Sequence, residues 1–221
     1  MRPSLSDDDV AGFRAAVLRV AQGLFARHGT DGVTMRQIAS ELGVSPTTAY
    51  RYFQNKEEIL AAVRASAFNA FCEVIEAAAA SSPDPRRSAR VVGDAYLEFA
   101  IRHPDAYRMM FDVNQAALSN SRELTEALER AKTCMVTYVE PLVERGFLHG
   151  EVRALGQMLW AAAHGLVMLR LSGVIAEDAE LRSLHEKTMS SIVRGANQVA
   201  RAPKEKGLAL VRTAGAKTRN R

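Results

Sequence analysis

The sequence predicts an all-α protein of about nine helices, and three observations lead to that prediction. Strong helix formers such as alanine, leucine, arginine and glutamate are abundant. Alternating runs of β-branched or aromatic residues with polar ones, the pattern of strands, are missing. In segment after segment, apolar residues instead recur three and four positions apart, which is the spacing of an amphipathic helix.

The first two predicted helices have clear start and stop signals. One covers residues 9–28, with Ser6 as its N-cap and Gly29 as its C-terminal stop. A second, short helix begins after Thr34 and ends at Gly43, because a glycine readily adopts the positive φ that ends a helix abruptly.

A third short helix follows at once and creates a helix-turn-helix pattern. Ser45 is its predicted N-cap, Pro46 occupies its first position, and it ends near Phe53. Small Ala39 lets the second and third helices approach closely, and the first helix braces them. The side facing the core is predicted to consist of Val44, Ala49 and Phe53.

The other side of this third helix carries hydrogen-bond donors that no core argument explains. In a helix-turn-helix the second helix enters the DNA major groove, and flanking donors hold phosphates. Thr47 is suited to contact a thymine methyl group, Arg51 a phosphate or a guanine, and Tyr50 a phosphate. Thr34 and Lys56 bracket the unit as further phosphate donors. The alternative is a solvated surface on a structural three-helix bundle.

The rest of the chain continues the helical pattern. A long helix is predicted over residues 56–80, and the prolines of the segment SSPDP, residues 81–85, end it. Further helices are predicted over residues 87–102, 104–111, 121–145, 151–172 and 178–200. The predicted division is a helix-turn-helix DNA-binding domain over residues 1–55, a larger helical domain over residues 56–200, and a basic, mostly disordered tail over residues 201–221.

Charge is concentrated at the two ends of the chain. The net charge of the whole chain is +4. Residues 1–56 carry seven Lys/Arg against five Asp/Glu, and residues 201–221 carry seven against one, so the middle is acidic. A polyanion such as double-stranded DNA should therefore meet the ends. For the basic tail, a solvated end is favoured over a nonspecific DNA arm or a remnant of cloning.

Composition also indicates the compartment. A chain of 221 residues that is 48% hydrophobic and 24% charged is large enough to bury a core. Its two cysteines, Cys72 and Cys134, lie within helical patterns and do not suggest a disulfide scaffold. No secretion signal is visible, and no apolar run approaches the roughly 20 residues that span a bilayer. We therefore expect a cytoplasmic protein with no membrane partner.

The segment VTMRQIASELGVSPTTAYRYFQNKEEIL, residues 33–60, resembles the TetR-type one-component transcriptional regulators. The turn glycine, the Ser-Pro entry, Tyr-x-Tyr-Phe and Asn-Lys-Glu-Glu occur together and in order. Arg51 falls at a variable position of that family. The resemblance implies DNA contacts at Thr34, Arg36, Ser45, Thr47, Thr48, Tyr50, Tyr52 and Lys56.

Two segments of the C-terminal half resemble the WHG (Trp-His-Gly) subgroup of TetR ligand-binding domains. They are LWAAAHGLVML, residues 159–169, and HPDAYRMMF, residues 103–111. The resemblance does not identify the effector.

Trp160 and His164 are four residues apart, so they share a helix face on which a small-molecule effector can bind. The alternative is a buried tryptophan beside a histidine satisfied by a backbone carbonyl. Large flexible and aromatic side chains elsewhere suit the same apolar pocket, although such stripes are more often plain core. The candidate effector-binding residues are Tyr107, Met110, Phe111, Met135, Tyr138, Trp160 and His164.

Motifs for other chemistry are missing. The five histidines do not form a metal-ligand spacing, and HExxH, CxxC, GxSxG, Walker and GxGxxG motifs are all absent from the sequence. We therefore expect no catalytic residues, no metal site and no cofactor. Cys72 is suited to a redox trigger, but a buried thiol fits its helical pattern better.

Small residues and broad apolar faces on the last two long helices predict a four-helix homodimer interface. The resulting expectation is a regulator, a repressor released from a palindromic operator by a small-molecule effector. Two alternatives stay open. One is an architectural DNA-binding protein without an effector, and the other is an α-helical enzyme using His164 with Tyr138 or Glu140.

Overall fold

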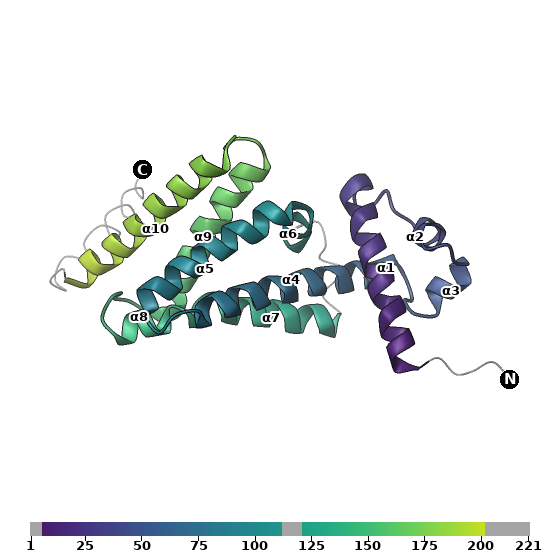
Figure 1. Cartoon of the computed structure of the whole chain (residues 1–221), viewed down its shortest axis with the longest axis horizontal. Helices are drawn as coiled ribbons and strands as arrows, with labels where there is room; N and C mark the ends of the chain where they lie inside the picture. The colour runs from purple at the N-terminus through teal and green to yellow at the C-terminus, as the bar shows by residue number, and fades with distance from the viewer. Residues whose placement is uncertain (1–5, 112–120, 202–221) are drawn as a thin grey trace, which may run out of the picture.

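The computed structural model describes residues 6–111 and 121–201, and these ranges contain ten α-helices and no strand (Figure 1). The all-α prediction is therefore confirmed. In chain order the helices are α1 (Asp7–His28), α2 (Met35–Glu41), α3 (Pro46–Tyr50), α4 (Lys56–Ala80), α5 (Pro85–Arg102), α6 (Pro104–Met110), α7 (Arg122–Thr137), α8 (Glu140–Glu144), α9 (Val152–Leu171) and α10 (Asp178–Arg201). Residues 202–221 of the predicted basic tail lie outside the described ranges.

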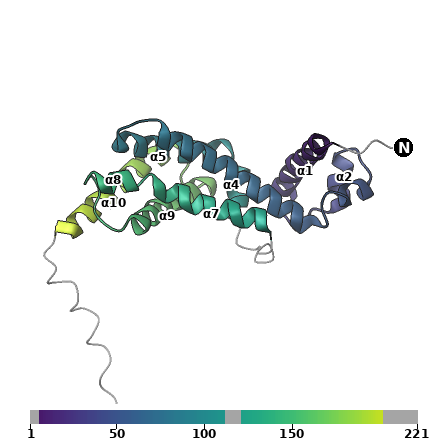
Figure 2. The ribbon, with the colours of Figure 1, turned by 90° about the horizontal axis from the view of Figure 1, so that it is seen from below.

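The molecule has two parts joined by α4. Helices α1 to α3 form a head at one end, and α5 to α10 form a larger body in which α5, α6 and α7 pack against the rest of α4 (Figures 1 and 2). The start of α4 packs against α1, whereas its later turns pack against α5 and α7. Because one helix belongs to both parts, a displacement of α4 in the body must also move the head.

Local capping explains where the head helices start. Ser6 accepts a hydrogen bond from the backbone N–H of Asp9, and Asp9 accepts in return from the N–H of Ser6. Thr34 and Gln37 form the same reciprocal pair at the start of α2. Asn55 caps α4 by accepting from the N–H of Glu58 at 2.8 Å.

Two predicted helices differ from the observed ones. The third ends at Tyr50 instead of near Phe53, because the next N–H groups donate to carbonyls three residues back and tighten the chain into a turn. The helix predicted over residues 121–145 is two helices, α7 and α8. Pro141 has no N–H to donate to the carbonyl of Thr137, and its ring crowds that carbonyl, so the α-helix breaks there.

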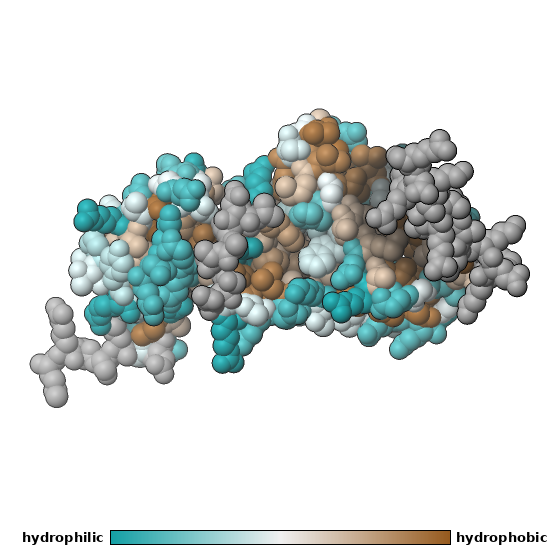
Figure 3. Space-filling view, turned by 180° about the vertical axis from the view of Figure 1, so that it is seen from behind, coloured by the Kyte–Doolittle hydropathy of each residue, from teal (hydrophilic) through white to brown (hydrophobic). Residues whose placement is uncertain are grey.

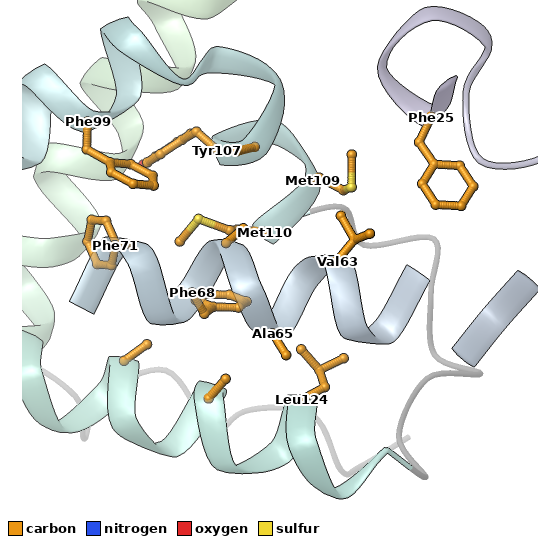
Figure 4. Packing of buried hydrophobic residues seen from close by; sticks show 14 of the residues in the cluster. Phe25, Val63, Ala65, Phe68, Phe71, Phe99, Tyr107, Met109, Met110 and Leu124 are labelled. Carbon is orange, nitrogen blue, oxygen red and sulfur yellow. The ribbon is translucent and has the colours of Figure 1, made fainter. Parts of the chain in front are cut away.

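A single large core runs from the head into the body. Phe25 of α1 lies beside Val63 of α4 and Met109 of α6, and further along α4 Phe68 and Phe71 continue the same cluster (Figure 4). Helix α6 contacts α1 as well as α4 and α5. The head is thus attached to the body through buried apolar side chains and not only through the chain connection.

Helices α9 and α10 lie at the far side of the body and are joined by a turn that contains Gly173. They pack against each other, and a second, smaller core cluster lies beside them, near α8. By length and composition alone, α9 is apolar enough to cross a membrane, although the sequence analysis expected no apolar run of that length. Core helices of water-soluble proteins have the same composition, and α9 packs against α5, α7 and α10.

Candidate functional site

A tight turn between α2 and α3 presents α3 to solvent. Gly43 has a φ of 68°, its N–H donates to the carbonyl of Ser40 at 3.0 Å, and the N–H of Val44 donates to the carbonyl of Ala39 at 3.0 Å. This is the Schellman arrangement that ends a helix at a glycine. It reverses the chain within two residues and places Ser45 where its hydroxyl caps α3.

Helix α3 has one buried and one exposed side, as predicted. Ala49 and Phe53 are buried in the head core, and Val44 is half-buried against it. Thr47 is exposed on the opposite side, and Tyr50 is 53% exposed although it is a large aromatic residue. The exposed side has no packing role within the head.

Three of the hydroxyl residues predicted to contact DNA also hold helix starts together. Thr34 accepts from the N–H of Gln37, and Ser45 accepts from the N–H of Thr48. The hydroxyls of Ser45 and Thr48 lie 2.9 Å apart and share a further hydrogen bond. Thr34 is therefore positioned by the backbone of α2, and Ser45 and Thr48 are positioned at the start of α3.

Tyr52 is held more firmly than the sequence indicated. Its ring lies 4.4 Å from the ring of Phe13 of α1, and its carbonyl accepts a hydrogen bond of 2.8 Å from Arg14. The guanidinium of Arg14 also covers the face of Phe53 at 4.2 Å. Arg14 was not among the predicted site residues. It lies three residues before buried Val17 on α1, and this spacing is the sequence signal that it faces the head core.

Lys56 and Arg36 differ in how firmly they are held. The ammonium of Lys56 donates to the carbonyl of Thr30 at 2.8 Å, which ties the start of α4 to the loop before α2. Arg36 is exposed on α2 and makes no hydrogen bond or ion pair with the described residues.

In the body, four of the seven candidate effector residues form one packed cluster. The ring centroids of Phe111 and His164 are 4.4 Å apart, and those of Phe111 and Trp160 are 6.3 Å apart. The hydroxyl of Tyr107 lies 2.8 Å from Nδ1 of His164. Met110, a fifth candidate, is buried in the main core beside α4 (Figure 4), and its carbonyl accepts from Arg64 at 2.9 Å.

A chain of buried polar groups extends from this cluster. The hydroxyls of Tyr96 and Tyr107 lie 2.6 Å apart, and burial raises the pKa of both, so both are neutral donors. Burial lowers the pKa of His164, which favours its neutral form. A neutral His164 protonated at Nε2 accepts from Tyr107 at Nδ1, and Tyr107 then accepts from Tyr96.

The indole N–H of Trp160 lies near this chain of polar groups but is not properly hydrogen-bonded to it. It is buried and makes no hydrogen bond of good geometry, although it lies near enough to the Tyr96 hydroxyl to offset part of that group's burial-raised pKa. Trp160 is therefore packed but not fully satisfied.

A pocket of about 590 Å³ opens next to the cluster, between α5 and α10. Its lining includes the other two candidate residues, Met135 and Tyr138, together with Tyr96. Tyr107, Met110, Phe111, Trp160 and His164 do not line it. The structure therefore separates the candidate residues into a packed aromatic cluster and part of a pocket, with Tyr96 touching both.

Several pocket residues were not predicted. They include Arg86 and Arg90 of α5 and His185 of α10. No local sequence signal marks them, because the pocket exists only through the spacing of two helices about ninety residues apart in the chain.

The remaining groups of chemical interest in the body are potential metal ligands and the two cysteines. Within residues 6–111 and 121–201 no group of three or more His, Cys, Asp and Glu is arranged to hold a metal ion. Cys72 and Cys134 are buried free thiols whose sulfur atoms lie 3.5 Å apart between α4 and α7. Cys72 is thus a buried thiol, as its pattern predicted.

Two family models match the chain. The model described as "Bacterial regulatory proteins, tetR family" matches residues 17–63, which cover the head and the start of α4. The model described as "Tetracyclin repressor-like, C-terminal domain" matches residues 89–192, which cover most of the body. Neither description names the WHG subgroup.

Solved structures share the fold along nearly their whole length. The fatty acid degradation regulator FadR of Bacillus halodurans is 16% identical, with a TM-score of 0.70 over 86% of this chain and 97% of that chain. A Rhodococcus sp. RHA1 protein of unknown function is 24% identical, with a TM-score of 0.73 over 84% and 95%. FadR of Bacillus subtilis, solved in complex with stearoyl-CoA, is 19% identical, with a TM-score of 0.70 over 82% and 98%.

Proposed function

Because the chain belongs to the tetR family of bacterial regulatory proteins and is a DNA-binding transcriptional regulator, we propose that it is a homodimeric repressor released from its operator by a small-molecule effector. The observation that carries this proposal is the exposed side of α3. A tight turn presents that side to solvent, and its large Tyr50 has no packing role in the head. Because the target is DNA, we assign the protein to the cytoplasm.

The DNA-binding domain of residues 1–55 inserts α3 into the major groove. Thr47 and Tyr50 point away from the head core and are placed to meet base edges or phosphates. The hydroxyl groups at the starts of α2 and α3, together with nearby basic side chains, hold the DNA phosphates and fix the register of the protein on the DNA. The proposed contacts are Thr34, Arg36, Ser45, Thr47, Thr48, Tyr50, Tyr52 and Lys56.

The effector-binding and dimerisation domain of residues 56–200 pairs through α9 and α10. Large apolar side chains stay exposed there on a single chain, among them Met158, Met168 and Leu169 of α9 and Val199 of α10. Hydrophobic surface gathers over the body, whereas the visible surface of the head is mainly hydrophilic (Figure 3). Pairing these two helices with those of a second copy buries such surface in a four-helix interface.

In the dimer, two α3 helices enter successive major grooves of a palindromic operator, about 34 to 36 Å apart. An effector that prefers a body arrangement with the wrong head spacing weakens DNA binding, and DNA weakens effector binding by the same factor. Helices α4 and α6 connect the two parts, because both contact α1 and both belong to the body. The complex of Bacillus subtilis FadR with stearoyl-CoA supports a small-molecule site in a body of this fold.

An architectural DNA-binding protein without an effector is the main rival. Such a protein needs no ligand cavity, so the pocket of about 590 Å³ in the body favours the sensor. An α-helical enzyme using His164 is less favoured. The imidazole is engaged by Tyr107 and packed against Phe111, which leaves no room for a substrate at Nδ1.

Selection of DNA by the purified protein tests the proposal. Genomic fragments retained by the full chain are sequenced and footprinted, and light scattering gives the mass of the complex. We expect one palindromic site with half-sites one helical turn apart and two subunits per site. Retention without sequence preference, or a single chain on an asymmetric site, contradicts it.

A further inference from the structure

We propose that the pocket between α5 and α10 binds an organic anion with an apolar body, and that Arg86 and Arg90 hold the anionic group. The inference rests on the proposed function, since the occupant takes the role of the effector there. It adds the chemical class of the ligand and moves the site away from the Trp160–His164 cluster.

The pocket has the size and the lining of a small-molecule site. Its volume of about 590 Å³ lies within the range of roughly 300 to 1,000 Å³ that such sites occupy. Most of its lining residues are apolar, and Val92, Met135, Leu148 and Leu159 are buried. An apolar or aromatic ligand body therefore loses water against these side chains on binding.

The polar side chains of the pocket lie at different positions along it. Helices α5 and α10, which both line the pocket, run antiparallel to each other. At one end Arg182 of α10 donates to Glu98 of α5 at 2.6 Å. Further along, His185 lies against Gly93, where an added Cβ would come within 2.7 Å of its Cε1. Towards the start of α5 lie Arg90 and then Arg86, one and two turns before Asp94.

The charged side chains at the two ends of the pocket differ in whether an oppositely charged group already pairs with them. The charge of Arg182 is matched by Glu98, whereas Asp94 and Glu186 also line the pocket and Asp94 lies near enough to His185 to act on its pKa. Arg90 makes no hydrogen bond or ion pair with any residue in the described part of the chain. Arg86 faces Asp84 only at 3.7 Å and covers the ring of Phe147 at 4.4 Å. An anionic group therefore finds a cationic partner at the Arg86–Arg90 end, whereas at the other end Arg182 is already paired with a carboxylate.

A half-buried hydroxyl in the pocket lining gives a second polar contact. Tyr138 lines the pocket, and its hydroxyl makes no hydrogen bond with the residues that the structure describes. Burial of the side chain raises the pKa of this hydroxyl, which therefore stays protonated and can donate to a ligand. A ligand with an acceptor atom in its apolar body satisfies it.

Three fluorescent probes with one aromatic body test the charge preference. Dansylglycine is anionic, dansylamide is neutral and dansylcadaverine is cationic. Each is titrated into the full-length protein, and binding is followed by dansyl emission and by energy transfer from Trp160, the one tryptophan of the chain. We expect dansylglycine to bind at one per subunit and about tenfold or more tighter than the other two, as a charge-assisted hydrogen bond predicts.

Two arginine substitutions on one helix provide the matched comparison. Arg90→Gln is expected to weaken dansylglycine binding about tenfold and to change dansylamide binding less than about twofold. Arg87→Gln removes an exposed arginine that does not line the pocket and is expected to change neither. Equal affinity for the three probes, tighter binding of dansylcadaverine, or equal effects of the two substitutions overturns the proposal.

The probe titrations need no DNA, so their failure is separate from failure of the proposed function. Operator selection with normal two-subunit binding but no preference for dansylglycine removes only the ligand assignment. Normal dansylglycine binding by a protein without DNA sequence preference removes the repressor function and leaves the anion pocket.

Discussion

The hydroxyl of Tyr107 lies 2.8 Å from Nδ1 of His164, which joins α6 to α9 through a partly buried hydrogen bond. The same hydroxyl lies 2.6 Å from the hydroxyl of Tyr96 on α5, and Tyr96 lines the pocket. Helix α6 also contacts α1 of the head. One side chain of α6 therefore links two other body helices, α5 and α9, and its own helix contacts the head.

Tyr107→Phe should destabilise the protein without changing its shape. The ring stays, but the Tyr96 hydroxyl and Nδ1 of His164 lose a buried partner, which costs about 1 to 3 kcal/mol. Urea denaturation followed by circular dichroism measures the loss. Tyr50→Phe is the control, because Tyr50 is 53% exposed and its hydroxyl makes no hydrogen bond with the described residues. Equal unfolding free energies for the two variants contradict the buried hydrogen-bond chain.

Stability should fall as pH decreases below the ordinary histidine pKa of 6.5. Burial lowers the pKa of His164 and His185, so the unfolded chain takes up protons before the folded one does. The free energy of unfolding then falls by at most about 1.4 kcal/mol per pH unit per histidine between 6.5 and the lowered folded pKa. Denaturation of the wild type and of His164→Asn at pH 7.5, 6.5 and 5.5 tests this. A variant slope as steep as the wild type's excludes His164 as a contributor.

Arg36→Gln should weaken operator binding uniformly across operator sequences. If Arg36 contacts a phosphate, the slope of log affinity against log salt becomes shallower by about one per subunit. Because Arg36 is exposed and makes no hydrogen bond or ion pair within residues 6–111 and 121–201, thermal stability should not change. Fluorescence anisotropy of a labelled operator at several salt concentrations measures the slope. Arg87→Gln in the body is the control, and identical slopes for the two variants reject the contact.

Lys56→Met should lower both operator affinity and head stability. Its ammonium donates to the carbonyl of Thr30, so the substitution removes a tether of about 1 kcal/mol as well as a positive charge. The salt slope and the melting temperature are measured on one preparation. A variant that loses DNA affinity without any loss of stability shows that the Thr30 contact is dispensable.

Gly43→Ala and Gly12→Ala should have opposite effects on stability. An added Cβ meets nothing within 4 Å at either position, so contacts do not distinguish them. Gly43 has a φ of 68°, which costs an alanine about 1 kcal/mol, whereas Gly12 lies inside α1, where alanine gains about 0.5 to 1 kcal/mol. Melting temperatures of the two variants decide between them. A stabilised Gly43→Ala protein contradicts the Schellman turn.

The fold could be predicted because helix starts and stops are local. Thr34 with Gln37 and Gly43 with the preceding carbonyls act within five residues, so their effect is readable from sequence. The break at Pro141 was equally readable and was missed, because the apolar period continues across it.

The sequence by itself determined the helices, the turn between α2 and α3, and which side of α3 is exposed, since hydrogen bonds and side-chain directions within a few residues decide these. Only the tertiary structure decided that Arg14 covers Phe53, that Trp160 and His164 pack into a filled cluster, and that the pocket lies beside Arg90. Those contacts join helices far apart in the chain. Their distances depend on how the whole body packs, and no short segment contains that information.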